Sequence, residues 1–168
     1  RRHVYNSEAI MNHALFAVED LAFNCILIRA NVLLKEIAET ISRPLPEELV
    51  AAMERAKMAL EQLWDETEGV YYSRSFISHK LIEEPTIATL LPLYAGTISK
   101  EKAARLVQLM ASRKWFKTNW PVPSVPINSS YFDPLKYWQG PTWININWLI
   151  IQGLERYDFK DEAQQLRQ

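Results

Sequence analysis

The chain has 168 residues, of which 48% are hydrophobic and 23% are charged, and its formal net charge is -1. This composition is typical of a globular protein, and the near balance of charges argues against binding to nucleic acid or an anionic membrane. No apolar run reaches the roughly 20 residues of a membrane span, and the single cysteine, Cys25, excludes an internal disulfide. Because Glu8, Glu19 and Asp20 come too early for a secretory signal, we expect a cytoplasmic location.

The first part of the chain predicts two helices of different character. Residues 16–40 are apolar on most sides of a helical cylinder, which is typical of a buried helix. Pro44 and Pro46 end that pattern. A second helix is predicted from Glu47 to about Trp64, with apolar residues on one face and charged residues on the other, so it should be half exposed.

The middle of the chain repeats this alternation after a long connection. Gly69 marks a turn, and residues 70–72 favour a short strand. An apolar helix is predicted from Thr86, its N-cap, to Gly96, with Pro92 kinking or shortening it. An amphipathic helix then begins after Ser99.

The last third of the chain contains one more pair of helices. A second long connection, residues 113–140, leads into an apolar helix over residues 142–157, with Pro141 at its first position. A short amphipathic helix over residues 160–167 follows.

A buried helix followed by a half-exposed helix thus occurs three times. This order is typical of an α/α toroid, in which inner helices line a ring and outer helices cover them, although a helical solenoid stacks helix pairs similarly. No sequence period of about 30 to 50 residues is visible, which weakens the solenoid alternative. About six helices are half of a six-hairpin ring. We therefore predict an all-α fold, a fragment of an (α/α)6 toroid, as one partial domain over residues 1–168.

Aromatic residues gather where the second connection meets the last apolar helix. Residues 113–148 hold five of the six tryptophans, and the block Tyr137–Trp143 joins the loop to the helix. Exposed aromatic rings stack on sugar rings, and Gln139 offers a donor and an acceptor to hydroxyl groups. Taken singly, each tryptophan is better explained as filling the core, but the loop position of Trp138 favours that residue as a sugar contact.

Acidic residues and histidines give weaker signals. Cleavage of a glycosidic bond usually requires two carboxyl groups that face each other across the bond. Glu83, Glu84 and Asp133 are candidates by position, but each is also explained as a solvated charge. The histidines lack the spacing of a metal-binding motif, so we expect no metal site and no cofactor; they are His3, His13 and His79.

Three segments resemble glycoside hydrolase family 63. They are FAVEDLAFNCILIRAN at 16–31, PTIATLLPLYAG at 85–96 and, most specifically, YWQGPTWININWLIIQGL at 137–154. The resemblance is greatest to the bacterial and archaeal mannosylglycerate and glucosylglycerate hydrolases, and it implies an (α/α)6 toroid. It also implies a reaction that inverts the anomeric centre, with an acidic general acid and a glutamate general base. Tyr137 and Trp138 match positions that line the family's sugar pocket, with Gln139 and Gly140 adjacent. These four residues are our candidate substrate-binding residues.

The sequence departs from the family pattern at both catalytic carboxylates. The family's general-acid motif precedes the FAVEDLAFN segment and has no match here. Its general base lies a few dozen residues beyond the YWQGP block, which corresponds to a position after Gln168. We therefore expect the chain to be part of an inverting hydrolase of α-glucosides or α-mannosides, such as glucosylglycerate or mannosylglycerate. This part contains no catalytic residue, and we expect it to be inactive alone. The alternative is a non-catalytic helical module that binds a sugar or a protein. Because a half ring leaves its end helices without neighbours, self-association or pairing with a complementing fragment is also expected.

Overall fold

The structure is a computed structural model that describes residues 6–14 and 16–167. Its strands are two residues long and pair as β1 with β4 and β2 with β3, both antiparallel, so the fold is predominantly helical. The elements in chain order are α1 (Ser7–His13), β1 (Val18–Glu19), α2 (Leu21–Thr40), α3 (Glu47–Glu61), β2 (Trp64–Asp65), β3 (Val70–Tyr71), β4 (Arg74–Ser75), the 3-10 helix η1 (Ile87–Leu90), α4 (Pro92–Ala95), α5 (Lys100–Ala111), α6 (Ile144–Arg156) and α7 (Lys160–Leu166).

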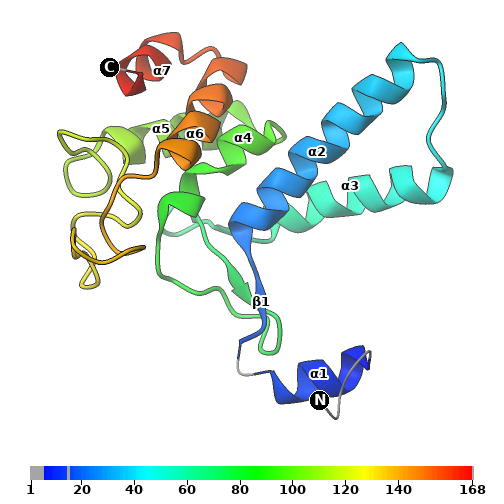
Figure 1. Cartoon of the computed structure of the whole chain (residues 1–168), viewed down its shortest axis with the longest axis horizontal. Coiled ribbons are helices and arrows are strands. Elements are labelled where there is room, and N and C mark those ends of the chain that lie inside the picture. Colours follow the sequence, from blue (N-terminus) through cyan, green and yellow to red (C-terminus); the bar gives the residue numbers. More distant parts are fainter. Residues whose placement is uncertain (1–5, 15, 168) are drawn as a thin grey trace.

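Helices α2 to α7 form three pairs along an arc. Helices α2, α4 and α6 are the inner members, and α4 contacts both α2 and α6 (Figure 1). The outer members α3, α5 and α7 pack against α2, α4 and α6 respectively. This arrangement matches the predicted alternation of inner and outer helices.

Local sequence signals explain several helix boundaries. The predicted caps are confirmed, since the Thr86 side chain accepts a hydrogen bond from the Ala88 N–H and the Ser99 side chain accepts one from the Lys102 N–H. Pro92 divides its segment into η1 and α4, as expected from its missing N–H. Gly96 then ends α4 in the left-handed conformation, which glycine adopts without steric cost.

Two predicted helix starts are wrong because of pairing between distant segments. The predicted helix at residue 16 begins instead at Leu21, since residues 18–19 pair with β4. Helix α6 begins at Ile144 and not at Pro141. The Pro141 carbonyl accepts a hydrogen bond from the Ser124 N–H at 3.1 Å, and Thr142 forms an isolated bridge with Pro123. Pro141 and Thr142 are therefore part of the loop that precedes α6.

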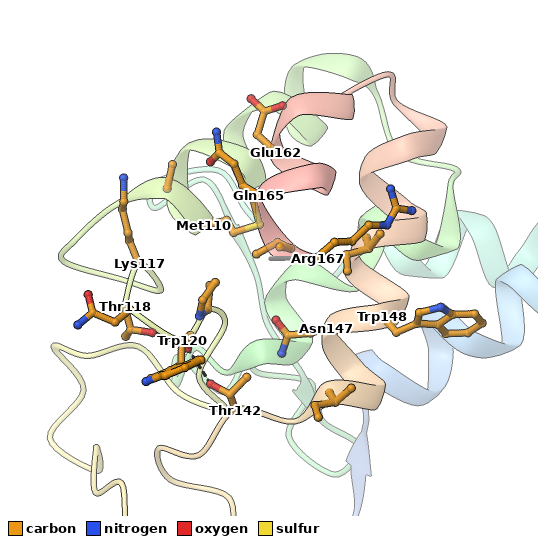
Figure 2. A pocket seen from close by; sticks show the side chains of 16 residues that line it. Met110, Lys117, Thr118, Trp120, Thr142, Asn147, Trp148, Glu162, Gln165 and Arg167 are labelled. Carbon is orange, nitrogen blue, oxygen red and sulfur yellow. Dashed lines mark hydrogen bonds between the residues drawn. The ribbon is translucent and has the colours of Figure 1, made fainter.

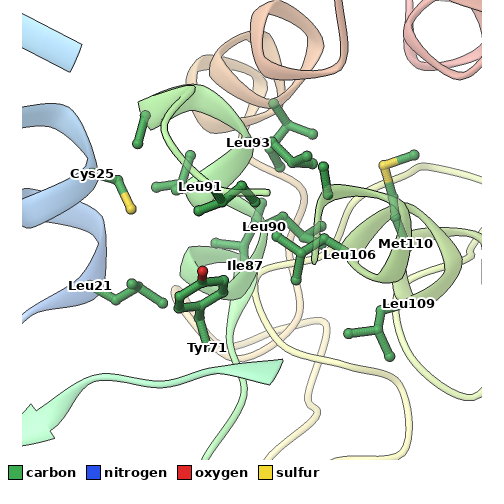
Figure 3. Packing of buried hydrophobic residues seen from close by; sticks show 14 of the residues in the cluster. Leu21, Cys25, Tyr71, Ile87, Leu90, Leu91, Leu93, Leu106, Leu109 and Met110 are labelled. Carbon is green, nitrogen blue, oxygen red and sulfur yellow. The ribbon is translucent and has the colours of Figure 1, made fainter. Parts of the chain in front are cut away.

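The core surrounds η1 and α4. The buried side chains of these two elements meet those of α2, β3 and α5 (Figure 3). Helix α6 approaches α4 closely at Gly153, where a Cβ atom would lie 2.6 Å from the Leu93 carbonyl carbon and the Tyr94 nitrogen. Among the core residues that Figure 3 labels are Leu21, Cys25, Tyr71, Leu90, Leu91, Leu93 and Leu106.

The two helices at the ends of the arc are less buried than their sequences predict. Helix α2 exposes a row of apolar residues in which Phe23 is 77% exposed, and α6 exposes Ile144 at 85%. These helices were expected to be buried because they are apolar on most sides. In the part of the chain that the structure describes, each has an inner neighbour on one side only, α4. The exposed row of α2 comprises Phe23, Leu27, Leu34 and Ile37, and it continues to Ile41, the residue after the helix.

Candidate functional site

The predicted sugar-binding residues lie in the loop that leads into α6. Tyr137 is 70% exposed and Trp138 is 49% exposed, whereas Gln139 is partly buried and Gly140 is buried. The Trp138 ring stacks on the Trp143 ring with the centroids 4.5 Å apart, and the Tyr137 ring meets Trp143 edge-on at 4.6 Å. We call Tyr137, Trp138 and Trp143 the aromatic cluster. It leaves much of Trp138 open to solvent, so this residue does not simply fill the core.

Hydrogen bonds within the loop hold the aromatic cluster in place. The Trp143 Nε1–H donates to the Tyr137 carbonyl at 3.1 Å. The Asp133 N–H donates to the Gln139 carbonyl at 2.6 Å, which closes the loop on itself. A Cβ atom at Gly140 would lie 2.6 Å from the Asp133 carbonyl oxygen, so this close approach requires glycine.

Ser124 connects this loop to the start of η1. Its hydroxyl accepts a hydrogen bond from the Gly140 N–H at 2.9 Å, and its carbonyl accepts one from the Ile87 N–H at 2.9 Å. Ile87 directly follows the cap residue Thr86. The aromatic cluster is therefore tethered to the N-terminal ends of two helical segments, η1 and α6.

Asn147 fastens the same region from inside α6. Its Oδ1 accepts a hydrogen bond from the Val122 N–H at 2.6 Å, and its Nδ2 donates to the carbonyls of Val122 and Trp143 at 3.1 and 3.0 Å. Asn147 is buried. Ser124 and Asn147 were not among the predicted site residues. For Asn147 the one available signal is a polar amide that recurs within an apolar helix, since buried amides need partners.

Two cavities adjoin the ends of the helices. The larger, of about 810 Å³, lies beside α6 and α7 and is lined by Trp120, Asn147 and Trp148 among others (Figure 2). Thr142 at its rim donates to the Trp120 carbonyl at 2.8 Å. The smaller, of about 220 Å³, lies at the starts of α2 and η1 and includes Asp20 and Glu84. Trp138 lines neither cavity.

The candidate carboxylates occupy different settings. Glu83 and Glu84 are both exposed, and Glu84 lines the smaller cavity. Tyr72 lines the same cavity, and its pKa is raised by the burial of its own side chain and by nearby carboxylates, Glu84 among them. Asp133 Oδ1 accepts a hydrogen bond from the Leu135 N–H at 2.9 Å, and Oδ2 lies 3.9 Å from Lys136 Nζ. These contacts give Asp133 a role in holding its own loop.

The described residues also bear on metals and membranes. Within residues 6–14 and 16–167 there is no group of three or more His, Cys, Asp or Glu side chains that could hold a metal ion. His3, one of the histidines considered above, lies outside the described residues. No helix of the described chain has the length and apolarity needed to cross a membrane.

The sequence of the chain is similar to those of known hydrolases. All 168 residues, 1–168, match a family model described as the mannosylglycerate hydrolase MGH1-like glycoside hydrolase domain. The chain is 37% identical over 167 residues to the mannosylglycerate hydrolase of Thermus thermophilus, covering 99% of this chain and 40% of that protein. It is 31% identical over 164 residues to the mannosylglycerate hydrolase MGH2 of Selaginella moellendorffii, covering 96% of this chain and 33% of that protein.

Solved structures of the same kind of hydrolase are also similar to this chain. The crystal structure of the GH63 mannosylglycerate hydrolase from Thermus thermophilus in complex with glucose matches with a TM-score of 0.91 and 36% identity, over 99% of this chain and 42% of that chain. The predictions of family 63 resemblance and of an (α/α)6 toroid fragment are therefore confirmed. This chain spans 40% or less of the length of the two hydrolases compared by sequence.

Proposed function

Because the chain belongs to the family of mannosylglycerate hydrolase MGH1-like glycoside hydrolase domains, we propose that residues 1–168 form part of the catalytic domain of an inverting glycosidase. Its substrates are α-glucosides or α-mannosides such as glucosylglycerate and mannosylglycerate. The observation that carries the proposal is the exposed, stacked aromatic cluster at the start of α6. The single cysteine supports a reducing, cytoplasmic compartment.

The aromatic cluster and its loop form one wall of the sugar pocket. Trp138 presents its exposed ring to the C–H face of the sugar, and Trp143 stacks behind it and fixes its orientation. Gln139 Oε1 is buried and has no hydrogen-bond partner among the described residues. A sugar hydroxyl that donates to this oxygen would satisfy it, because buried polar atoms are normally paired. Tyr137 and Gly140 complete the wall beside these two residues.

The carboxyl groups that break the glycosidic bond belong to the rest of the ring. In an inverting hydrolase one carboxylic acid protonates the leaving oxygen, and a carboxylate on the opposite face activates water. The contacts of Asp133 with Leu135 and Lys136 support a structural role for it. This chain therefore contributes sugar binding and does not contribute the acid or the base.

Titration of the purified chain with mannosylglycerate and glucosylglycerate, followed by calorimetry, tests this proposal. Trp138→Ala should weaken binding about five- to tenfold, because aromatic stacking contributes on the order of 1 kcal/mol beyond area burial. Trp120→Ala is the matched control, since Trp120 is also exposed but lies outside the aromatic cluster. Equal binding by Trp138→Ala and the wild type would contradict the assignment, as would an equal loss in Trp120→Ala.

A further inference from the structure

The smaller cavity, at the starts of α2 and η1, has a lining that combines acidic, hydroxyl and aromatic groups. Asp20, Tyr72 and Glu84 are among its polar residues, and Phe16, which is 82% exposed, adds an open aromatic ring. None of the described residues that line this cavity is basic. Its volume of about 220 Å³ corresponds to about seven water molecules, which is room for one sugar ring and not for two.

Tyr72 has a buried side chain whose hydroxyl group lacks a protein partner. The side chain is 5% exposed, and no hydrogen bond joins its hydroxyl to any of the described residues. Other hydroxyl groups of the lining are engaged, since that of Ser73 accepts from the Leu21 N–H and that of Thr89 donates to the Tyr71 carbonyl. Because buried polar groups are normally paired, the Tyr72 hydroxyl is open to a ligand in the cavity.

The two carboxylates of the cavity have free acceptor oxygens. Asp20 caps α2 through Oδ1, which accepts a hydrogen bond from the Phe23 N–H at 2.8 Å, and no described residue bonds its Oδ2. Glu84 is exposed, and its carboxylate has no partner in the described part of the chain. Burial raises the pKa of Tyr72, and nearby carboxylates raise it further, so the surroundings are negative. Such a lining repels a carboxylate and accepts hydrogen bonds from neutral hydroxyl groups.

The smaller cavity lies beside the loop that carries the aromatic cluster. Thr86 and Ala88 line the cavity, and Ile87 between them donates its N–H to the Ser124 carbonyl at 2.9 Å. The Ser124 hydroxyl accepts a hydrogen bond from the Gly140 N–H, also at 2.9 Å. Ser124 alone therefore bridges the cavity lining and the candidate sugar-binding loop.

We propose that the smaller cavity is a subsite for one neutral sugar ring, which Tyr72, Glu84 and Asp20 bind by its hydroxyl groups. The sugar hydroxyls donate to the free carboxylate oxygens, the Tyr72 hydroxyl pairs with one of them, and Phe16 packs against the C–H face. The acid group of a ligand such as mannosylglycerate lies outside this cavity, because no cation in the lining neutralises it. The inference deepens the proposed function and rests on it for the class of ligand.

Methyl α-D-mannopyranoside and sodium D-glycerate are the probes, because they separate the neutral ring from the acid. The readout is the 13Cζ signals of tyrosine in the labelled full chain, with that of Tyr72 assigned by Tyr72→Phe. The Tyr72 signal should shift saturably with the mannoside and stay unchanged with glycerate. Tyr157, whose hydroxyl is bonded to Ile98, is the control and should not shift.

Two neighbouring glutamates give a matched pair of variants for calorimetry with the mannoside. Glu84→Gln removes a charged acceptor from the cavity, so the apparent Kd should rise about tenfold. Glu83→Gln is the control, because Glu83 is also exposed but does not line the cavity. Tyr72→Phe removes only a hydroxyl that has no partner among the described residues, so it should fold normally and raise the Kd about two- to tenfold.

The outcomes distinguish the subsite from the aromatic cluster. If Tyr72 shifts with the mannoside and Trp138→Ala leaves that binding unchanged, the subsite stands and the proposed role of the aromatic cluster fails. If Tyr72 does not shift, the subsite is overturned, and a shift of Tyr137 in the same spectra keeps the aromatic cluster. The subsite is also overturned if glycerate or tetramethylammonium chloride moves Tyr72 as much as the mannoside does, or if Glu83→Gln weakens binding as much as Glu84→Gln.

Discussion

Tyr157 ties the end of α6 to the segment between α4 and α5. Its hydroxyl accepts a hydrogen bond from the Ile98 N–H and donates to the Ile98 carbonyl, both at 3.0 Å. Burial raises the pKa of Tyr157 to about 12, from an ordinary value of 10.0. The neutral hydroxyl is therefore favoured in the folded state, because burial penalises the charged phenolate.

This geometry predicts how Tyr157→Phe changes stability with pH. At neutral pH the variant should lose about 1–3 kcal/mol of unfolding free energy, because both Ile98 groups lose a partner. The unfolded tyrosine ionises near pH 10 and the folded one near 12, so the contribution of Tyr157 is present below pH 10 and falls between these values. Urea unfolding of both proteins across that range checks this. A difference that stays constant up to pH 12 would contradict the assignment.

At the scale of single residues, the sequence predicted the exposure and chemical character of a side chain better than it predicted the contacts of that side chain. The loop position of Trp138 favoured an exposed ring, and the ring is half exposed. The role of Ser124 was not predictable, because its hydrogen bonds to Gly140 and Ile87 join segments that are distant in the sequence. A serine in a proline-rich loop carries no local sign of such partners.

At the scale of elements, the sequence predicted helices well where local signals set their ends. Thr86 and Ser99 cap the segments they were expected to cap. Residues 142–143 were expected to be helical, but Pro141 is held in the loop by Ser124, which no helix propensity can indicate. The short helix α1 went unpredicted, although Asn6 caps it by accepting a hydrogen bond from the Ala9 N–H.

The attachment of α6 to its preceding loop depends on Asn147. Asn147→Ala should lower the free energy of unfolding by about 1–3 kcal/mol for each buried group left unpaired, here the Val122 N–H and carbonyl. Asn145→Ala is the control, because Asn145 is exposed on the same helix. Chemical denaturation measures both. If the two variants were equally stable, the amide would not fasten this loop.

At the scale of the whole molecule, the arc leaves apolar faces open at both ends. The exposed rows of α2 and α6 include Phe23, Leu27 and Trp148. Exposed apolar patches of this kind mark interaction surfaces, so we propose that the chain self-associates or pairs with a complementing fragment. Helical periodicity alone predicts these faces as buried, because it does not reveal which neighbour covers a face, whereas a half ring predicts open faces on its end helices.

Sedimentation velocity over a range of protein concentrations tests the open faces. Leu27→Glu and Trp148→Glu should each reduce self-association, because a charge on an apolar interface must be desolvated. Met58→Glu on the outer helix α3 is the control, since Met58 is also exposed. A chain that stays monomeric at high concentration and binds no apolar dye would show that these faces need no partner.

Saturation-transfer NMR of mannosylglycerate mixed with the wild-type chain tests the central claim, that this part of the ring binds sugar but lacks both catalytic carboxylates. Irradiation of the aromatic protons should transfer saturation to the C–H protons of the sugar ring, because in the proposed complex Trp138 stacks on that face. The substrate should stay intact in the same tube, because losing even one acid or base partner costs about 10² to 10⁴ in rate. Absence of transfer would contradict the binding claim. If the wild-type chain released free mannose and Glu84→Gln or Asp133→Asn did not, the chain would carry its own catalytic carboxylate.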